Sequence, residues 1–422
     1  MRQKTFYIAT LGCKLNYSES SHIARELQNH GFIIASHADY FILNTCTVTG
    51  VAEKKARSLI AQFHKKNPKA EIIVIGCFAA RDRAIVENLQ GVTKVFGSND
   101  KMNVISYLLE INIHQTPIIT NHLSLTTNFF PTFSSHDRTR SFLKIQDGCD
   151  YHCSYCAVAR ARGTSRSDTI ENVLRNLEKI AKLNCKEVVL TGVNTGEFGR
   201  KTGESFYQLL QEIDKHKLID RVRISSIEPN LLTDEIIRLF ANSSILMPHF
   251  HIPLQSGSDA VLAAMKRRYK TALFEEKVHQ IKSAMPHACI AVDLISGFPT
   301  ETETDFEESG RFLNSLPISY LHVFSYSKRP QTPAAEIKPQ VKDSVKKERT
   351  KILLQLSENK KTNFYQEHLH TKRAVLFEDD VKNGMIFGFT DNYIRISAPF
   401  DENYINQIIN IELTELNLKT VS

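Results

Sequence analysis

The sequence predicts an α/β protein in three parts: a parallel-sheet domain, a parallel partial barrel of six βα units, and a small C-terminal β-barrel. Over the first hundred residues, apolar strand patterns alternate with helical patterns about every 32 residues, which is typical of a parallel sheet. Between residues 142 and 330, further strand patterns alternate with helices, as in a partial or full parallel barrel. Residues 374–422 carry only short strand patterns, as in a small β-barrel.

The first part contains three apolar strand patterns, each followed by a helical pattern and each ending at a cysteine. The strands are expected at FYIATLG (6–12), YFILNT (40–45) and EIIVIG (71–76), and the cysteines are Cys13, Cys46 and Cys77. The carboxyl ends of parallel strands share one edge of a sheet, so we expect the three thiols to converge. The alternative is that each is a small buried apolar residue, a common role for free cysteine. Three cysteines in register favour a shared metal cluster.

We expect domains at 1–115, 139–370 and 371–422, with a linker at 116–138. The barrel strands are expected at FLKIQ (142–146), EVVLTG (187–192), VRISSI (222–227), FHIPLQ (250–255), CIAVDLI (289–295) and YLHVFSY (320–326). In parallel barrels the chemistry lies at the C-terminal ends of the strands, and the polar motifs of this chain follow those ends.

The most specific motif is DGCDYHCSYC, in which Cys149, Cys153 and Cys156 are spaced C-x3-C-x2-C. A closed structural zinc site has four ligands, whereas three thiolates on a four-iron cluster leave one iron open to bind another molecule. Zinc binding or coincidence is the alternative. Cys185 and Cys289 have no partner spacing, and we expect them in the core.

The phrase FLKIQDGCDYHCSYCAVARARGTSRS resembles the radical SAM superfamily and, within it, the methylthiotransferases. LGCKLN, NTCTVT and GCFAA resemble the N-terminal domain of those enzymes, and GFTDNYIRI (388–396) resembles a TRAM domain, a small barrel that contacts RNA. The resemblance implies two [4Fe-4S] clusters and S-adenosylmethionine (SAM). It implies that the SAM-cleaving cluster lies on Cys149, Cys153 and Cys156, and that an auxiliary cluster, which carries or supplies sulfur, lies on Cys13, Cys46 and Cys77.

Polar residues after the barrel strands predict where SAM binds. The candidates are Tyr155 in the cluster loop, Gly192 in TGVNTGEFG, Ser225 and Glu228 in SSIEP, and Gln255 and Ser256 in HIPLQSGSD. The glycine permits close backbone approach, the tyrosine could stack on an adenine, and the others could hydrogen-bond the ligand. A polar loop cap is the alternative for each residue taken alone.

Basic residues in two segments are candidate RNA contacts. Arg160, Arg162 and Arg166 follow the cluster loop and could bind phosphate or carboxylate bidentately, although a solvated basic loop is the alternative. In the C-terminal part the candidates are Lys382, Tyr393 and Arg395, yet residues 374–422 hold three Lys/Arg against eight Asp/Glu. The helical stretch 337–373, with ten Lys/Arg against four Asp/Glu, is either an RNA contact or a solvated brace.

Composition limits the class of protein. A net charge of +7 permits an RNA partner without requiring one. No apolar run is long enough to span a membrane, and the start MRQKTFY lacks a signal-peptide pattern. We therefore expect a cytoplasmic protein with no membrane partner and with reduced cysteines.

The resemblance implies an enzyme that converts N6-threonylcarbamoyladenosine, beside the anticodon of tRNA, to its 2-methylthio derivative. Its partners would be the tRNA anticodon loop, an electron donor and a sulfur source, and nothing in the sequence identifies the last two. The alternatives are methylthiolation of isopentenyl-adenosine in tRNA or of an aspartate in a ribosomal protein, and a non-catalytic RNA-binding iron–sulfur protein. GCKLN and QDGCDYHCSYC favour the first reading.

Overall fold

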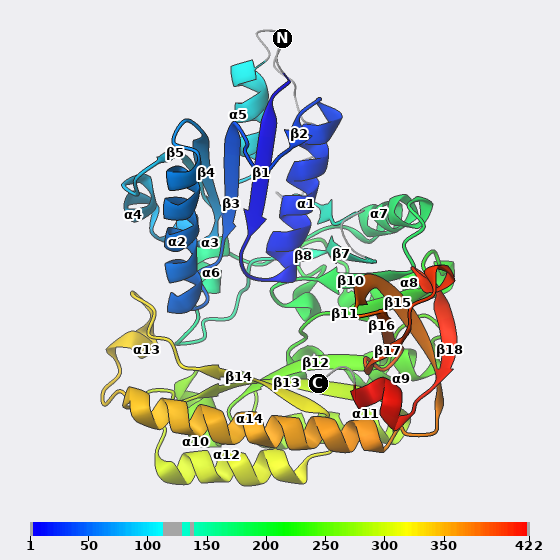
Figure 1. Cartoon of the computed structure of the whole chain (residues 1–422). Helices are drawn as coiled ribbons and strands as arrows, with labels where there is room; N and C mark the ends of the chain where they lie inside the picture. The colour runs from blue at the N-terminus through cyan, green and yellow to red at the C-terminus, as the bar shows by residue number, and fades with distance from the viewer. Residues whose placement is uncertain (1–2, 113–128, 136–138, 420–422) are drawn as a thin grey trace.

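The computed structural model describes residues 3–112, 129–135 and 139–419 (Figure 1). Its N-terminal part is a parallel sheet in the order β2-β1-β3-β4-β5, with helices on both faces. The elements are β1 Thr5–Thr10, α1 Lys14–Asn29, β2 Ile33–Ile34, β3 Tyr40–Thr45, α2 Gly50–Lys66, β4 Glu71–Gly76, α3 Cys77–Arg81, α4 Arg83–Glu87, β5 Val92–Phe96 and α5 Asn103–Asn112. The three predicted strands and the parallel sheet are confirmed. Strands β2 and β5 were not expected, because neither carries a long apolar run.

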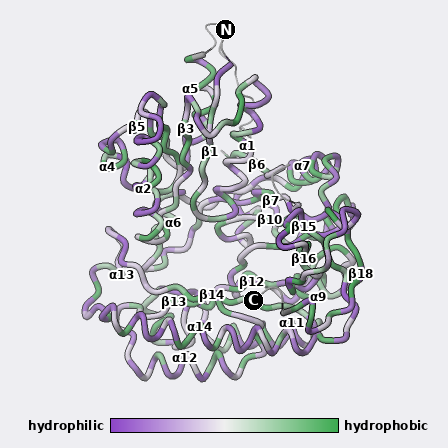
Figure 2. The backbone as a smooth tube through the Cα atoms, viewed as in Figure 1, coloured by the Kyte–Doolittle hydropathy of each residue, from purple (hydrophilic) through white to green (hydrophobic). Residues whose placement is uncertain are grey.

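The central strands of this sheet are covered on both sides. All six residues of β3 are buried, as expected for a parallel strand between two layers of helices. One apolar cluster, with Phe41 and Ile60, lies on the α2 side, and another, with Ile23 and Leu108, lies on the side of α1 and α5. Figure 2 shows apolar residues along the strands and also along the helices that cover them. The sheet is therefore a rigid support for the residues at its edge.

Much of the predicted linker, 116–138, lies outside the described residues. Its described part, 129–135, contains the short strand β6 (Thr132–Phe133), which pairs antiparallel with β7 (Arg140–Lys144). The Thr132 hydroxyl lies 2.6 Å from that of Ser18 on α1, and Arg25 on the same helix donates to the carbonyl of Phe133 at 3.2 Å. This segment therefore ties the first domain to the first strand of the barrel.

The six predicted barrel strands are present and form two sheets. The first has the order β11-β10-β7-β6, and the second has the order β12-β13-β14. The strands are β7, β10 Glu187–Thr191, β11 Arg221–Ile224, β12 His249–Gln255, β13 Cys289–Ser296 and β14 Tyr320–Ser325. Backbone hydrogen bonds such as that from Ile227 N to His251 O (3.1 Å) join the sheets. Within the described residues β7 and β14 do not pair, so the barrel is open on the side that faces the first domain.

Helices accompany the barrel; most pack around its outside, and the first of them packs against α3 of the first domain. They are α6 Val158–Arg162, α7 Ile170–Lys182, α8 Phe206–His216, α9 Asp234–Asn242, α10 Asp259–Ala264, α11 Thr271–Ala284, α12 Glu303–Ser315 and α13 Pro333–Glu336. Short strands β8 (Gln146–Asp147) and β9 (Arg166–Ser167) and the 3₁₀ turns Thr195–Glu197 and Pro229–Leu231 complete it. Several helices begin at a Ser or Thr whose side chain accepts a backbone N–H, and at Thr302 a capping box with Asp305 is complete.

The basic stretch forms one long helix, α14 (Asp343–Gln366), which lies along β14 (Figure 1). Two of its cations are buried: Lys346, and Arg349, whose guanidinium pairs with Glu301 at 2.7 Å and Glu303 at 2.8 Å. Part of the basic character predicted for this stretch is therefore used to hold α14 against the barrel. Among the described residues, no helix is both long and apolar enough to cross a membrane.

The C-terminal part is an antiparallel sheet in the order β17-β16-β15-β18. Its elements are β15 Lys372–Lys382, β16 Met385–Thr390, β17 Arg395–Pro399, the 3₁₀ turn Glu402–Tyr404, β18 Ile408–Glu412 and α15 Glu415–Lys419. The expected short strands are found, but the edge strands β17 and β18 are not neighbours, so the sheet is a half-barrel and not the closed small barrel that was predicted. It packs against the starts of the barrel strands, where Arg223 donates to the carbonyls of Asp391 and Thr390 at 2.7 and 2.8 Å.

Candidate active site

Cys149, Cys153 and Cys156 lie in the loop after β8, at the carboxyl end of the barrel. All three line a cavity of about 300 Å³, whose wall continues through strands β12, β13 and β14. The backbone N–H of Tyr151 donates to Cys149 Sγ at 3.4 Å, and that of Val158 donates to Cys156 Sγ at 3.4 Å. The loop therefore directs three sulfur atoms and their hydrogen-bond donors toward one space.

The donor set fits a multi-iron cluster better than a single metal ion. A tetrahedral zinc site with Zn–S bonds of 2.3 Å would bring its sulfurs within ~3.8 Å of one another. Among the described residues, the one trio of His, Cys, Asp or Glu ligand atoms within 4.8 Å of one another is His251, Asp293 and His322, with no cysteine. Burial raises the pKa of Cys149, so a thiolate there needs a positive partner such as iron.

The second set of cysteines lies at the carboxyl edge of the N-terminal sheet, as predicted. Strand β3 pairs in register with β1 and β4, and Thr45, before Cys46, lies opposite Gly76, before Cys77, so the three cysteines follow neighbouring strand ends. Burial raises the pKa of the Cys46 thiol to about 11. Gly12 has a φ of +106°, and a Cβ there would lie 2.7 Å from Cys46 Cβ. Only glycine fits this turn, because the chain must pass directly against the next cysteine. This set also fits a cluster held by three thiolates.

The two sets of cysteines lie on elements that touch. Helix α3, which begins at Cys77, packs against α6, which begins two residues after Cys156. Val48 and Thr49, which follow Cys46, line the same cavity as the barrel cysteines. The backbone N–H of Gly50 also donates to Ser327 Oγ at 3.2 Å across the gap. One cavity therefore lies between the carboxyl edges of both sheets.

Three of the six predicted SAM contacts line this cavity: Tyr155, Glu228 and Gln255. Gly192, Ser225 and Ser256 are not among the lining residues. The Ser225 hydroxyl accepts the N–H of Gly192 at 3.3 Å, and Ser256 is buried with its hydroxyl 3.4 Å from that of Ser309. Strand-end motifs located the cavity, but they could not show which side chain of each motif faces inward.

Arg267 is a site residue that the strand-end motifs did not indicate, because it follows helix α10. Its guanidinium donates to Cys153 Sγ at 3.1 Å, to the Tyr155 hydroxyl at 3.4 Å and to the Glu228 carboxylate. Burial raises the pKa of Glu228 to about 7, against the opposing charge of Arg267. Two charges are thereby kept inside a water-poor cavity, next to a cysteine that would hold iron.

The three arginines after the cluster loop have different roles. Arg162 is buried, and its guanidinium contacts Asp147 at 2.8 Å, Asn16 at 2.5 Å and Glu19 at 3.3 Å. It cannot reach RNA, because these partners enclose it. Arg160 is exposed and donates to Gln331. Arg166 pairs with Asp147 at 3.2 Å, with its side chain at the rim of a cleft.

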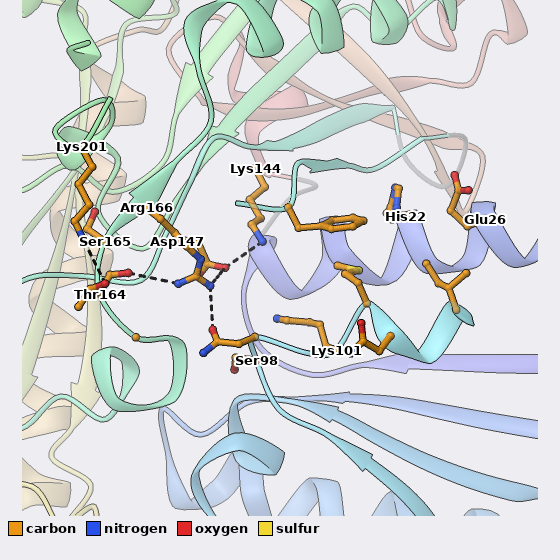
Figure 3. Close-up of a pocket in the computed structure, with 16 residues that line it drawn as sticks. His22, Glu26, Ser98, Lys101, Lys144, Asp147, Thr164, Ser165, Arg166 and Lys201 are labelled. Atoms are coloured by element: carbon orange, nitrogen blue, oxygen red, sulfur yellow. Dashed lines mark hydrogen bonds and ion pairs between the residues drawn. The ribbon is translucent and has the colours of Figure 1, made fainter. Parts of the chain in front are cut away.

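This cleft, of about 400 Å³, lies between the first domain and the barrel (Figure 3). Behind it the buried carboxylate of Glu19 binds Lys101 at 2.6 Å and Lys144 at 3.0 Å. Lys144 also pairs with Asp147 at 3.0 Å. The charges come from α1, the segment before α5, β7 and β8, so they join the two domains. Burying these charges costs desolvation free energy, and removing one member costs more stability because it leaves its partner buried and unpaired.

The predicted RNA contacts of the C-terminal sheet are engaged with other residues. The ring of Tyr393 stacks on His249 with 4.2 Å between centroids and on Phe389 with 4.7 Å, so its faces are covered by the protein. Arg395 and Lys382 both pair with Asp380, at 3.0 and 3.1 Å. Lys382 is exposed, whereas the Arg395 side chain is about one-third exposed. Tyr393 therefore holds the sheet against the barrel rather than stacking on RNA.

Comparisons with known proteins agree with this geometry. A family model described as the radical SAM superfamily matches residues 143–313, and one described as uncharacterized protein family UPF0004 matches residues 5–97. Among solved structures, the radical S-adenosylmethionine methyltransferase TsrM from Kitasatospora setae superposes with a TM-score of 0.58 at 14% identity. That match covers 79% of this chain and 77% of TsrM, and it shows the shared fold.

Curated relatives match almost the whole chain. The threonylcarbamoyladenosine tRNA methylthiotransferase MtaB of Bacillus subtilis strain 168 is 35% identical over 418 residues, which cover 96% of this chain and 92% of the relative. MtaB of Thermotoga maritima is 36% identical over 400 residues, covering 93% and 91%. The tRNA-2-methylthio-N(6)-dimethylallyladenosine synthase of Endomicrobium trichonymphae is 30% identical over 423 residues, covering 99% and 98%. The chain belongs to the radical SAM methylthiotransferase family.

Proposed function

We propose that the chain is a tRNA methylthiotransferase that converts N6-threonylcarbamoyladenosine, beside the anticodon, to its 2-methylthio derivative. The observation that carries the proposal is the pair of cysteine trios at the carboxyl edges of two facing sheets, with one cavity between them. The relatives of higher identity are named for this substrate, whereas those named for dimethylallyladenosine are 30–32% identical. The proposed substrate is an RNA of the cytoplasm, and we place the enzyme there on that ground.

Each trio has a separate proposed role. Cys149, Cys153 and Cys156 would hold the SAM-binding [4Fe-4S] cluster, and Cys13, Cys46 and Cys77 would hold the auxiliary one. The chemistry that these groups supply when bound is radical formation at the first site and sulfur donation at the second. The chain's own contribution is to hold the two sites against one cavity.

The side chains around the cavity orient what enters it. Arg267 keeps Cys153, Tyr155 and Glu228 in one hydrogen-bonded set, so the wall is preorganised before any ligand arrives. Gln255 has a φ of +73° at an irregular step between β12 and β13, which turns its side chain into the cavity. A backbone strained at this place is consistent with a binding role.

RNA has to reach the cavity as an unstacked base, which an anticodon loop permits at low cost. Among the predicted basic contacts, Arg160 is exposed after the cluster loop, Arg166 lines the cleft between the first domain and the barrel, and Lys382 is exposed on the C-terminal sheet. We propose these three as contacts to the RNA backbone. Arg162 is buried and the ring faces of Tyr393 are covered by His249 and Phe389, so these two are not proposed, and Arg395 shares the Asp380 partner of Lys382. An electron donor and a sulfur source are also required by this reaction.

The test is activity of the reconstituted protein on defined RNA. Anticodon stem-loops carrying N6-threonylcarbamoyladenosine or isopentenyl-adenosine are incubated with SAM and a low-potential reductant, and the nucleosides are analysed by mass spectrometry. The proposal expects the 2-methylthio product from the first RNA and little from the second. Product from the isopentenyl RNA alone would show that the proposed substrate is wrong.

Iron counting tests the cysteine assignment independently of activity. Cys46→Ala is expected to lose about four irons per chain, because one ligand of three is removed. Cys185→Ala is the matched control, since Cys185 is half-buried and its thiol donates only to backbone carbonyls of Thr139 and Glu187. Equal iron in both variants would contradict an auxiliary cluster on Cys46.

A further inference from the structure

The cleft between the first domain and the barrel is separate from the cofactor cavity. Its wall includes residues 163–166, directly after helix α6, whereas the wall of the cofactor cavity includes Val158, at the start of that helix. Among the described residues, none lines both spaces. Apart from Arg166, the proposed function uses none of the residues that line the cleft. The cleft therefore has no ligand assigned to it.

The charges around the cleft do not balance. The charged side chains that line it and those in ion pairs with them are five cations and three anions among the described residues. The cations are Lys101, Lys144, Arg162, Arg166 and Lys201, and the anions are Glu19, Glu26 and Asp147. In Figure 3, Glu26 lies at the opposite end of the cleft from Arg166 and Lys201. The positive excess is therefore concentrated near those two residues.

This positive excess does not depend on the protonation of Lys101. Arginine stays charged in proteins, so Arg162 and Arg166 match the negative charges of Glu19 and Asp147. Lys144 and Lys201 then remain against the single carboxylate of Glu26. Burial lowers the pKa of Lys101, but the release of its proton would still leave the positive charges in excess.

The cleft is also rich in hydrogen-bond donors that have no acceptor in the protein. Lys101 is buried, and its ammonium donates only to Glu19 among the described residues, so two of its three N–H groups are unused. The Ser165 hydroxyl is buried and accepts from Gln146 at 3.0 Å. The Thr164 hydroxyl accepts from Lys201 at 3.2 Å. Neither hydroxyl donates to a residue that the structure describes, so both protons are available to a ligand.

We infer that this cleft binds a phosphate group, held by Lys101 and Lys201 and by the hydroxyls of Thr164 and Ser165. A phosphate offers negative charge and several acceptor oxygens, which complement the positive excess and the unused donors. A divalent cation would be repelled by the same charges, and an apolar ligand would leave the donors unpaired. The volume of about 400 Å³ has room for a phosphate together with water or an attached sugar.

The inference does not depend on the proposed function. The phosphate group belongs either to a free ion or to the backbone of a bound RNA, and both present the same oxygens to the cleft. The experiment therefore first tests the site with inorganic phosphate and then tests the source of the group with RNA.

In the first experiment, inorganic phosphate is titrated into the cluster-loaded protein at constant ionic strength, with chloride as the reference, and binding is measured by calorimetry. Wild type is expected to bind phosphate and to gain melting temperature from it. Lys101→Met should bind about 10-fold more weakly, because a buried charged hydrogen bond is lost. Lys201→Met should bind about 3-fold more weakly, since Lys201 is exposed and its charge is screened.

The variants differ in their risk to folding. Lys101→Met removes one of the three cations around Glu19, whereas Lys201 is exposed and makes one hydrogen bond, so Lys201→Met tests the site even if the first variant does not fold. The matched control is Lys215→Met, on α8, because Lys215 is 68% exposed and does not line the cleft. It should bind phosphate as wild type does.

The second experiment measures binding of labelled anticodon stem-loops without reductant. If the cleft takes an RNA phosphate, inorganic phosphate should displace RNA more than chloride does. The Lys101→Met and Lys201→Met variants should then bind modified and unmodified stem-loops more weakly by the same factor, because phosphate contacts carry no sequence information. If the cleft takes a free ion, these variants should lose phosphate binding and keep wild-type RNA binding. Either result supports the site.

Two results would overturn the inference. One is a wild type that binds phosphate no better than chloride, and the other is phosphate binding by the cleft variants that equals that of Lys215→Met. Because these measurements do not depend on turnover, either result would leave the proposed function standing, and an inactive enzyme would leave the phosphate site standing.

Discussion

Glu19→Gln tests whether a single buried carboxylate locks the first domain onto the barrel. Glu19 is fully buried and contacts Lys101 at 2.6 Å, Lys144 at 3.0 Å and Arg162 at 3.3 Å. These cations lower the pKa of Glu19 despite its burial, so the carboxylate is charged at neutral pH. Glutamine has nearly the same volume, so the substitution removes the charge without creating a cavity.

The expected loss of unfolding free energy depends on which ion-pair partners the cations keep in the variant. Lys144 and Arg162 keep Asp147, but Lys101 has no other ion-pair partner in the described residues. Breaking a buried pair at one member costs about 3–5 kcal/mol, because the other charge stays buried. Burial already lowers the pKa of Lys101, so in the variant Lys101 can release its proton instead of remaining as a buried, unpaired charge. This release limits how much unfolding free energy the substitution removes. We expect the free energy of unfolding to fall by roughly 3 kcal/mol.

The assay is urea denaturation of the cluster-free protein, followed by circular dichroism. The matched control is Glu87→Gln, because Glu87 pairs with Arg83 at 2.8 Å while both side chains are about half exposed. An exposed pair contributes at most about 1 kcal/mol. A Glu19→Gln midpoint within error of that of Glu87→Gln, at equal slope, would refute the reasoning.

Three further predictions concern the site and its supports. Arg267→Lys keeps the charge but cannot contact both its sulfur and its carboxylate partners, so RNA-independent SAM cleavage should fall about 10-fold; an unchanged rate would show that the bridge is not used. Gly12→Ala should lose auxiliary iron because its Cβ would meet Cys46 at 2.7 Å, whereas Gly31→Ala, with no atom within 4 Å, should keep it; equal iron contents would contradict this. Burial raises the pKa of Asp168 to about 6, so the folded protein holds a proton there that the unfolded chain releases above pH ~4, and stability falls as pH rises toward 6. Asp168→Asn should therefore gain melting temperature relative to wild type between pH 4.5 and 7, and a constant difference would refute the shift.

Much of the fold was predictable from local pattern. The six barrel strands and the three long strands of the first domain are runs of β-branched and apolar residues, and their periodicity survives in the structure. Strands β2 and β9 were not predictable, because two-residue strands form only when a neighbour supplies their hydrogen bonds. The half-barrel of the C-terminal sheet likewise depends on how its edges pack.

In the candidate site, too, the features set by neighbouring residues were predictable and those set by distant segments were not. The close spacing of Cys149, Cys153 and Cys156 is a local property, so the sequence could indicate their convergence. Arg162 illustrates the opposite case: its neighbours suggested a basic surface loop, but the fold buries it against carboxylates from two other segments. Charge partners that are distant in the chain cannot be read from a charge run.

The sequence by itself determined the elements, the strand-end positions of both cysteine trios and the family to which the chain belongs. These are properties of short segments, because strand periodicity and ligand spacing are set within a few residues of one another. Only the tertiary structure decided which polar side chains face the cavity, and that Arg267 bridges Cys153 and Glu228. Those facts depend on segments that are distant in the chain and meet in space, and the energetic effect of burial and charge is set only where they meet.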